Sequence, residues 1–393
     1  MRNRMTVLAL LVGAAACSDT TTPTSLAPTD AALSAAPVGE AIPGQYIVLF
    51  KSGTSDVRGK ARAKASAHGA KLQHVYVSAV QGFAGAMSEA AAAALRNDPD
   101  VAVVEQDQVM TASTTQTGAT WGIDRIDQHN LPLSGSYTFT ANGAGVTAYI
   151  IDTGIEITHP ELGGRASVGY DAVGDGRNGI DCNGHGTHVS GTTGGSTYGV
   201  AKAVTLVAVR VLDCNGSGST SGVIAGIDWV TANRVLPAVA NMSLGGGAST
   251  TLDQAVQRSI AAGVTYAIAA GNGNFLGIAQ DACKTSPARV PEAITIGATS
   301  NTDAKASWSN YGNCVDFFAP GVNITSSWLN GGTNTISGTS MATPHVTGVA
   351  ALYLQGNPSA SPATVRDALY AATTKGIVTN SKTVNNHLLF TSY

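Results

Sequence analysis

Charged side chains are scarce in this sequence. Only 12% of its 393 residues are Asp, Glu, Lys or Arg, and the formal net charge is -3. Domains that bind nucleic acid carry a clustered excess of Lys and Arg, so this composition argues against a nucleic-acid partner. The low charge does not indicate disorder either, because 44% of the residues are hydrophobic and can form a sizeable core.

Long hydrophobic runs are also scarce. The apolar stretch VLALLVGAAA at residues 7–16 follows Arg2 and Arg4 and is too short to span a bilayer. This pattern, which ends in small residues, is typical of an export signal, so residues 1–17 are assigned to one and the protein is expected to be secreted. Cleavage after residue 16 leaves Cys17 first, as in plain secretion or in a lipoprotein signal whose cysteine is lipidated. Both predict the same cut, and lipidation of Cys17 is the only membrane attachment we expect.

Close cysteine spacing is absent as well. Four cysteines lie beyond the signal: Cys182, Cys214, Cys283 and Cys314. No C-x-x-C pair of a metal site occurs, and an even number of cysteines in an exported protein favours disulfides. Two bridges are therefore predicted, although four cysteines allow three pairings.

The N-terminal third of the chain predicts a tether and a small domain. Residues 18–43 are rich in Thr, Ala, Ser and Pro, which is typical of a flexible tether. Strands are expected at 45–50, 74–80, 82–87 and 101–107, and helices at 55–70 and 88–97. This βαββαβ order is the ferredoxin-like arrangement of a small α+β domain. The polar segment 108–120 has no periodicity and predicts a linker.

The pattern changes from Trp121 onward. Continuous apolar runs, each bounded by Gly, Asn or Asp, lie at 145–152, 204–212, 237–244, 263–270 and 293–298. Such runs are typical of parallel strands buried on both faces, and helical patterns lie between them. The fold class is therefore α/β, with a mostly parallel central sheet flanked by helices. Functional groups are expected beyond the carboxyl ends of its strands.

Three short motifs carry candidate chemistry. ISGTSMATPHVTG places Ser340 ahead of a helical pattern, and we expect this serine at the helix N-cap with Pro344 tolerated in the first turn. YIIDTG places Asp152 at the carboxyl end of a buried strand, and CNGHGTHVSG places His185 between glycines. Each signal is weak alone, since such residues often only cap helices or form turns. Together, in the order Asp, His and Ser, the three motifs match a known pattern of catalytic residues far more specifically than any one of them does.

This combination resembles the subtilisin-like serine proteases, within them the proteinase K branch, and most of all the exported aqualysin-type bacterial enzymes. The resemblance runs from about Trp121 to the C-terminus and includes PAVANMSLGGG, AAGN and WSNYGNCVDFFAPG. It implies a subtilisin-like peptidase domain at 114–393 and serine endopeptidase activity on polypeptides. Residues 44–113 resemble the family's inhibitory propeptide, an intramolecular partner that is cut off near Ser113–Thr114.

The resemblance also implies roles for individual residues. Ser340 matches the nucleophile, His185 the base that accepts its proton, Asp152 the group that orients the imidazole, and Asn272 the side-chain donor of the oxyanion hole. His188 and His345 match no such position and are expected to be structural. Substrate-binding positions are Ser217, Gly218, Leu244, Gly245, Gly246, Ala269, Ala270 and Gly271. The small residues predict a roomy pocket that prefers large apolar or aromatic side chains.

In the aqualysin-type enzymes the matching cysteines pair 182 with 214 and 283 with 314. The resemblance further implies structural calcium at two sites with oxygen ligands. One consists of Asp316 with the carbonyls of Pro291 and Ala293. The other consists of Asp124, Asp127, Gln128, Ser134 and Ser136.

Two alternatives belong to other functional classes. An α/β-hydrolase esterase would use Ser340, Asp367 and His387 in that order, but Ala342 stands where the G-x-S-x-G elbow needs its last glycine. An inactive binding relative would lack a member of the triad, and all three are present. Nothing in the sequence calls for more than a monomer.

Overall fold

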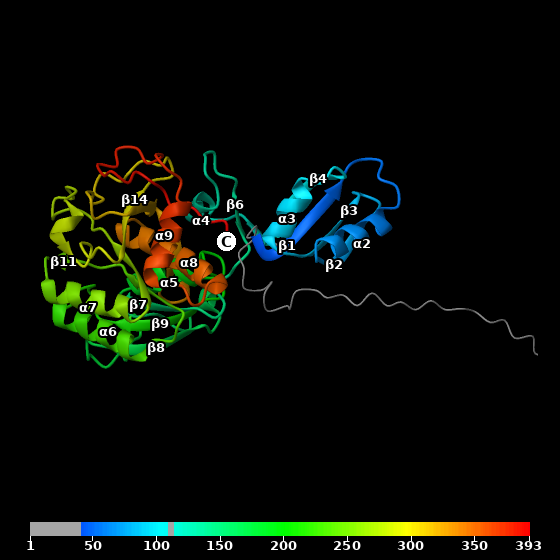
Figure 1. The fold of residues 1–393 in the computed structure, drawn as a ribbon. Helices are drawn as coiled ribbons and strands as arrows, with labels where there is room; N and C mark the ends of the chain where they lie inside the picture. The colour runs from blue at the N-terminus through cyan, green and yellow to red at the C-terminus, as the bar shows by residue number, and fades with distance from the viewer. Residues whose placement is uncertain (1–40, 109–113) are drawn as a thin grey trace, which may run out of the picture. The chain divides into compact units, whose positions relative to one another are not determined.

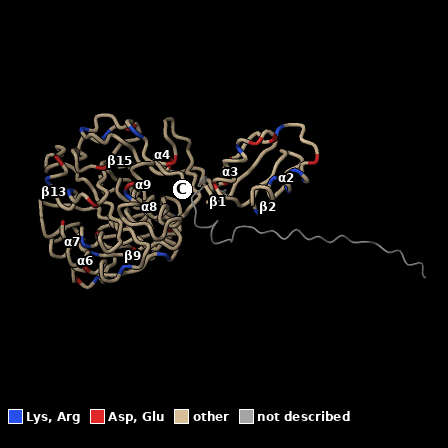
Figure 2. The backbone as a smooth tube through the Cα atoms, in the orientation of Figure 1, with Lys and Arg blue, Asp and Glu red and all other residues tan. Residues whose placement is uncertain are grey.

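The computed structural model describes residues 41–108 and 114–393, which cluster into two compact units divided near Gln108. The expected export signal, Cys17 and most of the tether lie outside the described residues, as does the position before the predicted cut. Figure 2 shows acidic and basic residues interspersed along both units. No described helix is long and apolar enough to cross a membrane.

The first unit has the predicted ferredoxin-like order. Its elements are β1 Ala41–Phe50, α2 Val57–Ala67, β2 Lys71–Tyr76, β3 Gly82–Ala86, α3 Glu89–Arg96 and β4 Val101–Gln108. The four strands form one sheet in the order β2-β3-β1-β4, with a core that includes Val48, Phe83 and Leu95. The tether prediction is wrong for residues 41–43, because β1 begins at Ala41 and the Ile42 carbonyl accepts a hydrogen bond from Gln106 Nε2.

The second unit is built on a seven-stranded parallel sheet. Its strands are β7 Thr147–Asp152, β8 Ala166–Asp171, β9 Thr205–Arg210, β10 Ala238–Met242, β12 Val264–Ala269, β14 Ile294–Thr299 and β15 Phe317–Pro320. Their order is β15-β14-β12-β10-β7-β9-β8. Every residue of β7, β10, β12 and β14 is buried, as the continuous apolar runs predicted.

Helices cover both faces of this sheet (Figure 1). One core joins the sheet to α5 His185–Gly194, α8 Thr339–Gly356 and α9 Pro362–Ala372. A second core joins it to α6 Thr220–Asn233 and α7 Thr250–Ala261. Helix α8 is buried almost all round instead of along one stripe, because α5, α9 and five strands of the sheet contact it.

Short elements complete the unit. They are α4 Trp121–Ile126, β5 Thr114–Thr117, β6 Ser136–Phe139, β11 Gly246–Gly247, β13 Thr285–Ser286, β16 Ile324–Trp328 and β17 Gly332–Ile336, with 3₁₀ turns at Pro160–Leu162 and Ala282–Lys284. The linker prediction is wrong for residues 114–117, because they pair as β5 with β6. The chain is therefore part of the second unit from Thr114 onward.

A buried ion pair anchors the start of this unit. Arg125 of α4 is fully buried, and its Nε lies 2.7 Å from Asp303 Oδ1. Another guanidinium nitrogen donates to the Gln128 carbonyl at 2.6 Å, so the charge is satisfied without water. Loss of one partner would leave an uncompensated buried charge, which makes this pair important for the position of α4.

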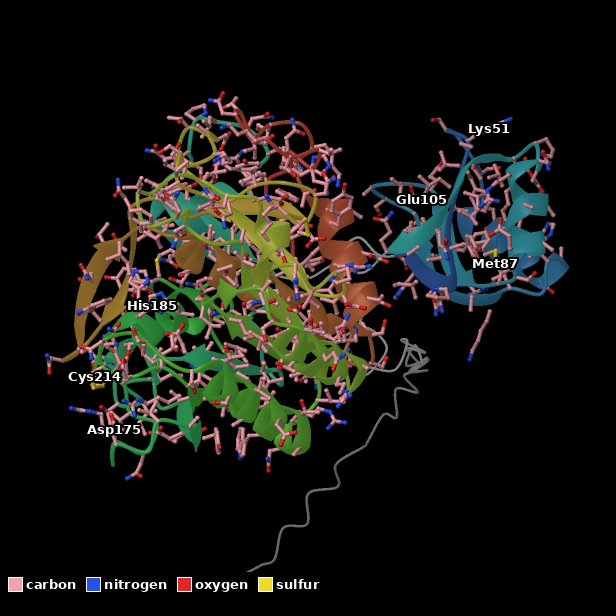
Figure 3. All side chains as sticks on the ribbon, turned by 90° about the vertical axis from the view of Figure 1, so that its left-hand side faces the viewer. Lys51, Met87, Glu105, Asp175, His185 and Cys214 are labelled. Atoms are coloured by element: carbon pink, nitrogen blue, oxygen red, sulfur yellow. A yellow bond between two sulfur atoms is a disulfide. The ribbon has the colours of Figure 1, made fainter. Side chains whose placement is uncertain are left out.

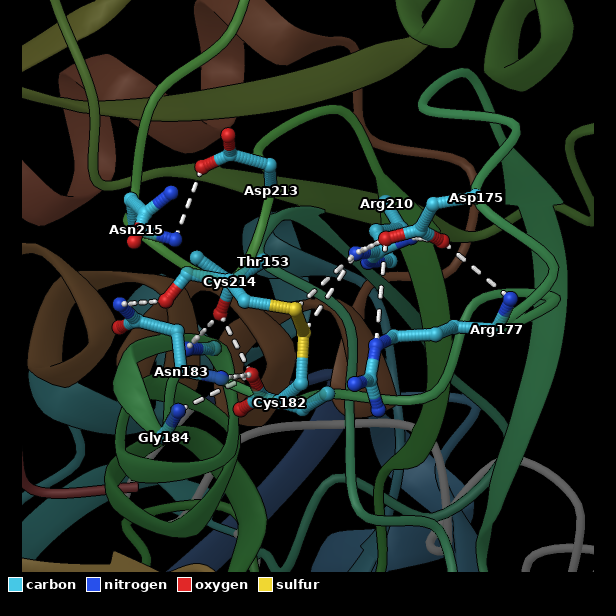
Figure 4. Close-up of a disulfide and its surroundings, with 12 residues drawn as sticks. Thr153, Asp175, Arg177, Cys182, Asn183, Gly184, Arg210, Asp213, Cys214 and Asn215 are labelled. Atoms are coloured by element: carbon cyan, nitrogen blue, oxygen red, sulfur yellow. Dashed lines mark hydrogen bonds and ion pairs between the residues drawn. A yellow bond between two sulfur atoms is a disulfide. The ribbon is translucent and has the colours of Figure 1, made fainter.

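Both disulfides predicted by the resemblance are present: Cys182–Cys214 and Cys283–Cys314. The first closes a loop with a sequence separation of 32 residues. By loop-closure entropy, a loop of this length contributes about 3–4 kcal/mol to stability. Figure 4 shows Arg210 beside this bridge. Arg210 is buried, and Nη1 pairs with Asp175 at 2.6 Å, while a second nitrogen lies 3.5 Å from Cys182 Sγ.

Candidate active site

Asp152 and His185 meet at the carboxyl edge of the sheet. Asp152 is the last residue of β7 and is fully buried, whereas His185 is the first residue of α5 and its side chain is 24% exposed. His185 Nδ1 lies 2.7 Å from Asp152 Oδ1, which also accepts the backbone N–H of Thr153 at 2.7 Å. Nδ1 therefore carries the proton, which leaves Nε2 as the basic nitrogen. Figure 3 labels His185 on this unit.

A second carboxylate, Asp181, fixes the loop that carries His185. Its Oδ1 accepts from Thr153 Oγ1 at 2.9 Å and from the backbone N–H groups of Asn183 and Gly184 at 2.9 and 3.0 Å. Its Oδ2 accepts from the N–H and the hydroxyl of Thr187 at 2.9 and 2.6 Å. Asp181 thus joins the turn after Asp152 to the first turn of α5.

The electrostatic environment favours a protonated His185. Burial lowers the pKa of His185, but the charge and hydrogen bond of Asp152, together with the charge of Asp181, outweigh it and raise the pKa above the ordinary histidine value. The imidazole can therefore accept a proton at Nε2 readily, and Asp152 stabilises the positive charge that results.

Ser340 lies in the first turn of α8, and the N-cap prediction is wrong. Gly338 is the N-cap, so Ser340 is the second helical residue and Pro344 the sixth. Because proline has no N–H, the Ser340 carbonyl loses its helical donor, and the Ser243 hydroxyl donates to it at 2.8 Å instead. Ser340 Oγ donates to the Ser243 carbonyl at 3.1 Å. A proton transfer from Ser340 to His185 would require this hydroxyl to rotate away from the Ser243 carbonyl.

Asn272 faces the start of α8. Its Oδ1 accepts from the N–H and the hydroxyl of Thr339 at 2.8 and 2.9 Å. With its oxygen fixed in this way, the side chain presents Nδ2 as a donor. The backbone N–H of Ser340 lies in the first turn of the helix, where N–H groups have no acceptor within the helix. Asn272 Nδ2 and the Ser340 N–H together create a region of positive potential next to the Ser340 side chain.

Two cavities flank these residues and contain all the predicted substrate-binding positions. One of about 520 Å³ lies beside His185 and is lined by segments 215–220 and 243–247, which include Ser217, Gly218, Leu244, Gly245 and Gly246. The other, of about 360 Å³, lies beside Ser340 and is lined by Leu244, Gly245, Gly246, Ala269, Ala270 and Gly271. Asn272 also lines the second cavity.

Comparison with known proteins agrees with this geometry. The subtilase family model matches residues 143–388, and the peptidase inhibitor I9 model matches residues 45–113. The chain belongs to the subtilase family. It is 52% identical to an extracellular serine proteinase of Thermus sp. (strain Rt41A) over 98% of both chains. It is 53% identical to alkaline serine exoprotease A of Vibrio alginolyticus over 81% of this chain and 60% of that protein.

The fold comparison gives the same result. The crystal structure of a cold adapted subtilisin-like serine proteinase matches with a TM-score of 0.68 and 56% identity, and covers 70% of this chain and 98% of that chain. These findings confirm the resemblance, the subtilisin-like fold and the identification of this subtilase as a serine proteinase with an inhibitory propeptide.

The other histidines of the motifs are buried in the subtilase core. His188 Nε2 lies 3.0 Å from the Ile324 carbonyl, and His345 Nδ1 lies 2.9 Å from the Met341 carbonyl. Burial lowers the pKa of each to about 4, so both are neutral at ordinary pH. Both rings lie in the core, and His188 Nδ1 is buried without a hydrogen-bond partner.

The residues of the esterase alternative are placed differently. Asp367 is exposed and pairs with Arg366 at 3.3 Å, and His387 Nδ1 accepts from the N–H of Gly376 at 3.3 Å. His185, in contrast, already has a buried carboxylate partner.

One predicted calcium cluster is assembled near the start of the subtilase unit. It comprises Asp124, Asp127, Gln128, Ser134 and Ser136. Asp124 accepts from the hydroxyl of Ser134 at 2.9 Å and from the N–H of Gly135 at 2.8 Å. Asp127 Oδ2 accepts from Thr138 N–H at 2.6 Å, but its Oδ1 is buried without a hydrogen-bond partner. Burial raises the pKa of Asp127 to about 6. An orphaned buried carboxylate oxygen among other oxygens fits a calcium ion.

The other predicted calcium cluster already has a cation beside it. Asp316 Oδ2 accepts from Thr295 N–H at 2.7 Å, and burial raises the pKa of Asp316 to about 6 although the charge of Arg366 lowers it. Arg366 Nη1 donates to the Pro291 carbonyl at 2.7 Å. A calcium ion that uses Asp316, Pro291 and Ala293 therefore competes with this guanidinium. Within residues 41–108 and 114–393, no group of three His, Cys, Asp or Glu side chains could hold a metal alone.

Several residues around the site escaped the sequence analysis. Asp181, Asn310, Ser243 and Thr339 all hold the functional groups in place. Asn310 lines the pocket beside Ser340, donates to the Ala270 carbonyl at 2.8 Å and accepts from Gly273 N–H at 3.0 Å. Asn310, Ser243 and Thr339 lie within the family segments WSNYGNCVDFFAPG, PAVANMSLGGG and ISGTSMATPHVTG, and this was the signal available for them. Polar residues among small ones otherwise look like ordinary turn formers.

Proposed function

We propose that this subtilase is an exported, self-maturing endopeptidase in which Asp152, His185 and Ser340 form the catalytic triad. The observation that carries the proposal is the 2.7 Å contact between His185 Nδ1 and the buried Asp152, together with the position of Ser340 in the first turn of α8. Export is supported by the signal-like N-terminus and by the extracellular Thermus relative.

The reaction follows from these roles. Ser340 Oγ attacks the peptide carbonyl carbon, and its proton moves to His185 Nε2. Asp152 stabilises the imidazolium and remains ionised. The peptide C–N bond then breaks as His185 returns the proton to the leaving amine, which leaves the acyl group on Ser340. Water, deprotonated by the same histidine, attacks the ester and releases the second product.

The oxyanion formed in each step needs donors that are already in position. Asn272 Nδ2 and the Ser340 N–H are the proposed pair, since Thr339 holds the Asn272 carbonyl oxygen away from the substrate. Segments 215–219 and 243–247 would bind an extended peptide by backbone pairing, which tolerates many sequences. The cavity lined by Ala269, Ala270 and Gly271 would accept a large apolar or aromatic residue before the cut.

Labelling with phenylmethylsulfonyl fluoride tests the proposal. The mature protein should hydrolyse a chromogenic peptide anilide ending in Phe, lose that activity with the reagent, and carry one sulfonyl group on the fragment that contains Ser340. A label on another residue, or full activity after treatment, would contradict it.

Replacement of Asn272 by leucine, which has a similar volume but no donor, tests the oxyanion hole. We expect kcat to fall about 100- to 1000-fold with little change in KM, because the lost bond is made mainly in the transition state. A rise in KM at constant kcat would instead assign Asn272 to ground-state binding. Steady-state kinetics over a range of peptide anilide concentrations distinguish the two.

Calcium would stabilise this subtilase without taking part in the reaction. We propose that it binds the Asp124 cluster and, in competition with Arg366, the carbonyl and carboxylate oxygens of Pro291, Ala293 and Asp316. The orphaned Asp127 Oδ1 supports the first site. A site that binds only the folded state stabilises it by about 2.7 kcal/mol when the ion is present at 100 times its Kd.

Two variants in an inactive Ser340→Ala background separate the two calcium sites. Asp127→Asn should remove one calcium ion from the binding stoichiometry and lower the gain in Tm on adding calcium. Arg366→Gln should tighten binding at the other site, because it removes the competing guanidinium. Isothermal titration and scanning calorimetry measure both effects. Unchanged titrations in both variants would show that neither cluster binds calcium.

A further inference from the structure

A turn beside the candidate active site presents large apolar side chains to water. In the segment 274–278, which we call the apolar turn, Phe275 is 94% exposed, Leu276 66% and Ile278 56%. Soluble proteins rarely gather exposed apolar groups in one place without a binding partner. The segment 273–280 contains no charged residue, so the turn offers a partner apolar contact and no ion pair.

The apolar turn has a defined backbone. Asn274 Oδ1 accepts from the N–H groups of Leu276 and Ile278 at 3.0 and 3.1 Å. The Asn274 N–H in turn donates to the Ile278 carbonyl at 2.9 Å, and the Gly277 N–H donates to the Asn274 carbonyl at 2.8 Å. The exposed side chains are therefore carried on an ordered loop, which lowers the entropic cost of binding through them.

The apolar turn is continuous with the pocket beside Ser340. Asn272 and Gly273, which directly precede it, both line that pocket. Asn310, another lining residue, accepts from the N–H groups of Gly273 at 3.0 Å and Gln280 at 2.8 Å. One side chain therefore ties both ends of the turn to the pocket wall, so the apolar turn borders the pocket.

We propose that the apolar turn is an extension of the substrate-binding surface that contacts apolar residues flanking the cleaved bond of a polypeptide. The proposal rests on the proposed endopeptidase function and names a further specificity determinant for it. Phe275 and Leu276 would cover apolar substrate side chains that the pocket itself does not reach. Unfolded protein segments rich in Leu and Phe are the substrates that such a surface favours.

The test compares wild type with the double variant Phe275→Ser/Leu276→Ser. The control is Val235→Ser/Leu236→Ser, which removes two other exposed apolar side chains, 63% and 52% exposed, from the segment that leads into β10. The substrates are a short peptide anilide and two longer quenched peptides with the same residues before the cut. One longer peptide carries Leu and Phe at all other positions, and the other carries Ser and Gly.

We expect the turn variant to lose about 3- to 10-fold in kcat/KM on the apolar long peptide, mainly through KM, as partial loss of apolar contact predicts. Its kcat/KM on the anilide and on the polar peptide should stay within twofold of wild type, and the control should match wild type on all three. Equal losses on both long peptides, or none, would overturn the proposal. So would self-association of wild type that the turn variant abolishes, because the partner would then be a second copy. A wild type that cannot hydrolyse the anilide would overturn the proposed function itself.

Discussion

Replacing Ser340 with alanine is expected to lower kcat on a peptide anilide by about 10⁶-fold. Without the hydroxyl no acyl-enzyme can form, and in subtilisin, a member of the same family, loss of the nucleophile costs about 2 × 10⁶-fold. The variant should fold normally, since Ser340 Oγ makes one hydrogen bond, to the Ser243 carbonyl. KM or substrate affinity should change little, because the cavity walls remain.

The measurement needs a variant that is free of its propeptide. Placing a cleavage site for a second protease at residues 109–113 allows removal without self-cleavage. Ser337→Ala is the matched control, because this exposed serine lies three residues earlier. Its Oγ accepts a hydrogen bond from the Asn323 N–H at 2.8 Å. It should keep wild-type kcat. Residual activity above about one hundredth of wild type in Ser340→Ala would show that another group is the nucleophile.

Replacing Asp152 with asparagine is expected to lower kcat by about 10⁴-fold. Asp152 Oδ1 accepts from both Thr153 N–H and His185 Nδ1. If the asparagine oxygen takes the Oδ1 position, both donors stay satisfied, but the negative charge that stabilises the imidazolium is lost. If the NH₂ group takes that position, it opposes Thr153 N–H and donates to His185 Nδ1, so the proton sits on Nε2, which then cannot act as a base.

The same variant should shift the pH dependence of the remaining activity. His185 must be neutral to accept the serine proton, so activity rises with pH through its pKa. Burial lowers that pKa, but Asp152 and Asp181 raise it above the ordinary histidine value. Removing the charge of Asp152 lowers the pKa, so the acid limb of kcat/KM should move to lower pH. A limb that does not move would mean that another group sets it.

The sequence predicted the structure where a residue pattern is compatible with only one kind of structure. The apolar runs ending in Asp152 and Ala270 predicted two central parallel strands, since few other structures bury every residue of a segment. The joint match of three motifs then identified the family, and the family supplied the cysteine pairing that spacing alone left open. The structure also brings every predicted substrate-binding residue to one of the two cavities.

Features that depend on tertiary contacts could not be predicted. The N-cap prediction for Ser340 used local preference, but the extended backbone of Gly338 begins the helix and the Ser243 hydroxyl replaces the bond that Pro344 cannot make. Asp181 was not predicted as an active-site residue, because its five hydrogen bonds form only when the turn after Asp152 and the start of α5 come together. Arg366 lies far along the chain from Pro291, so its contact with that carbonyl left no sequence signal.

The most direct test of the account is the intact mass of the full-length protein beside its Ser340→Ala variant, both expressed and purified identically with calcium. The account predicts that wild type separates into a propeptide and a mature enzyme that begins near Thr114, while the variant remains joined. If the variant is cut at the same place and to the same extent in the absence of any other protease, Ser340 is not the nucleophile. The proposed self-maturing endopeptidase would then be contradicted.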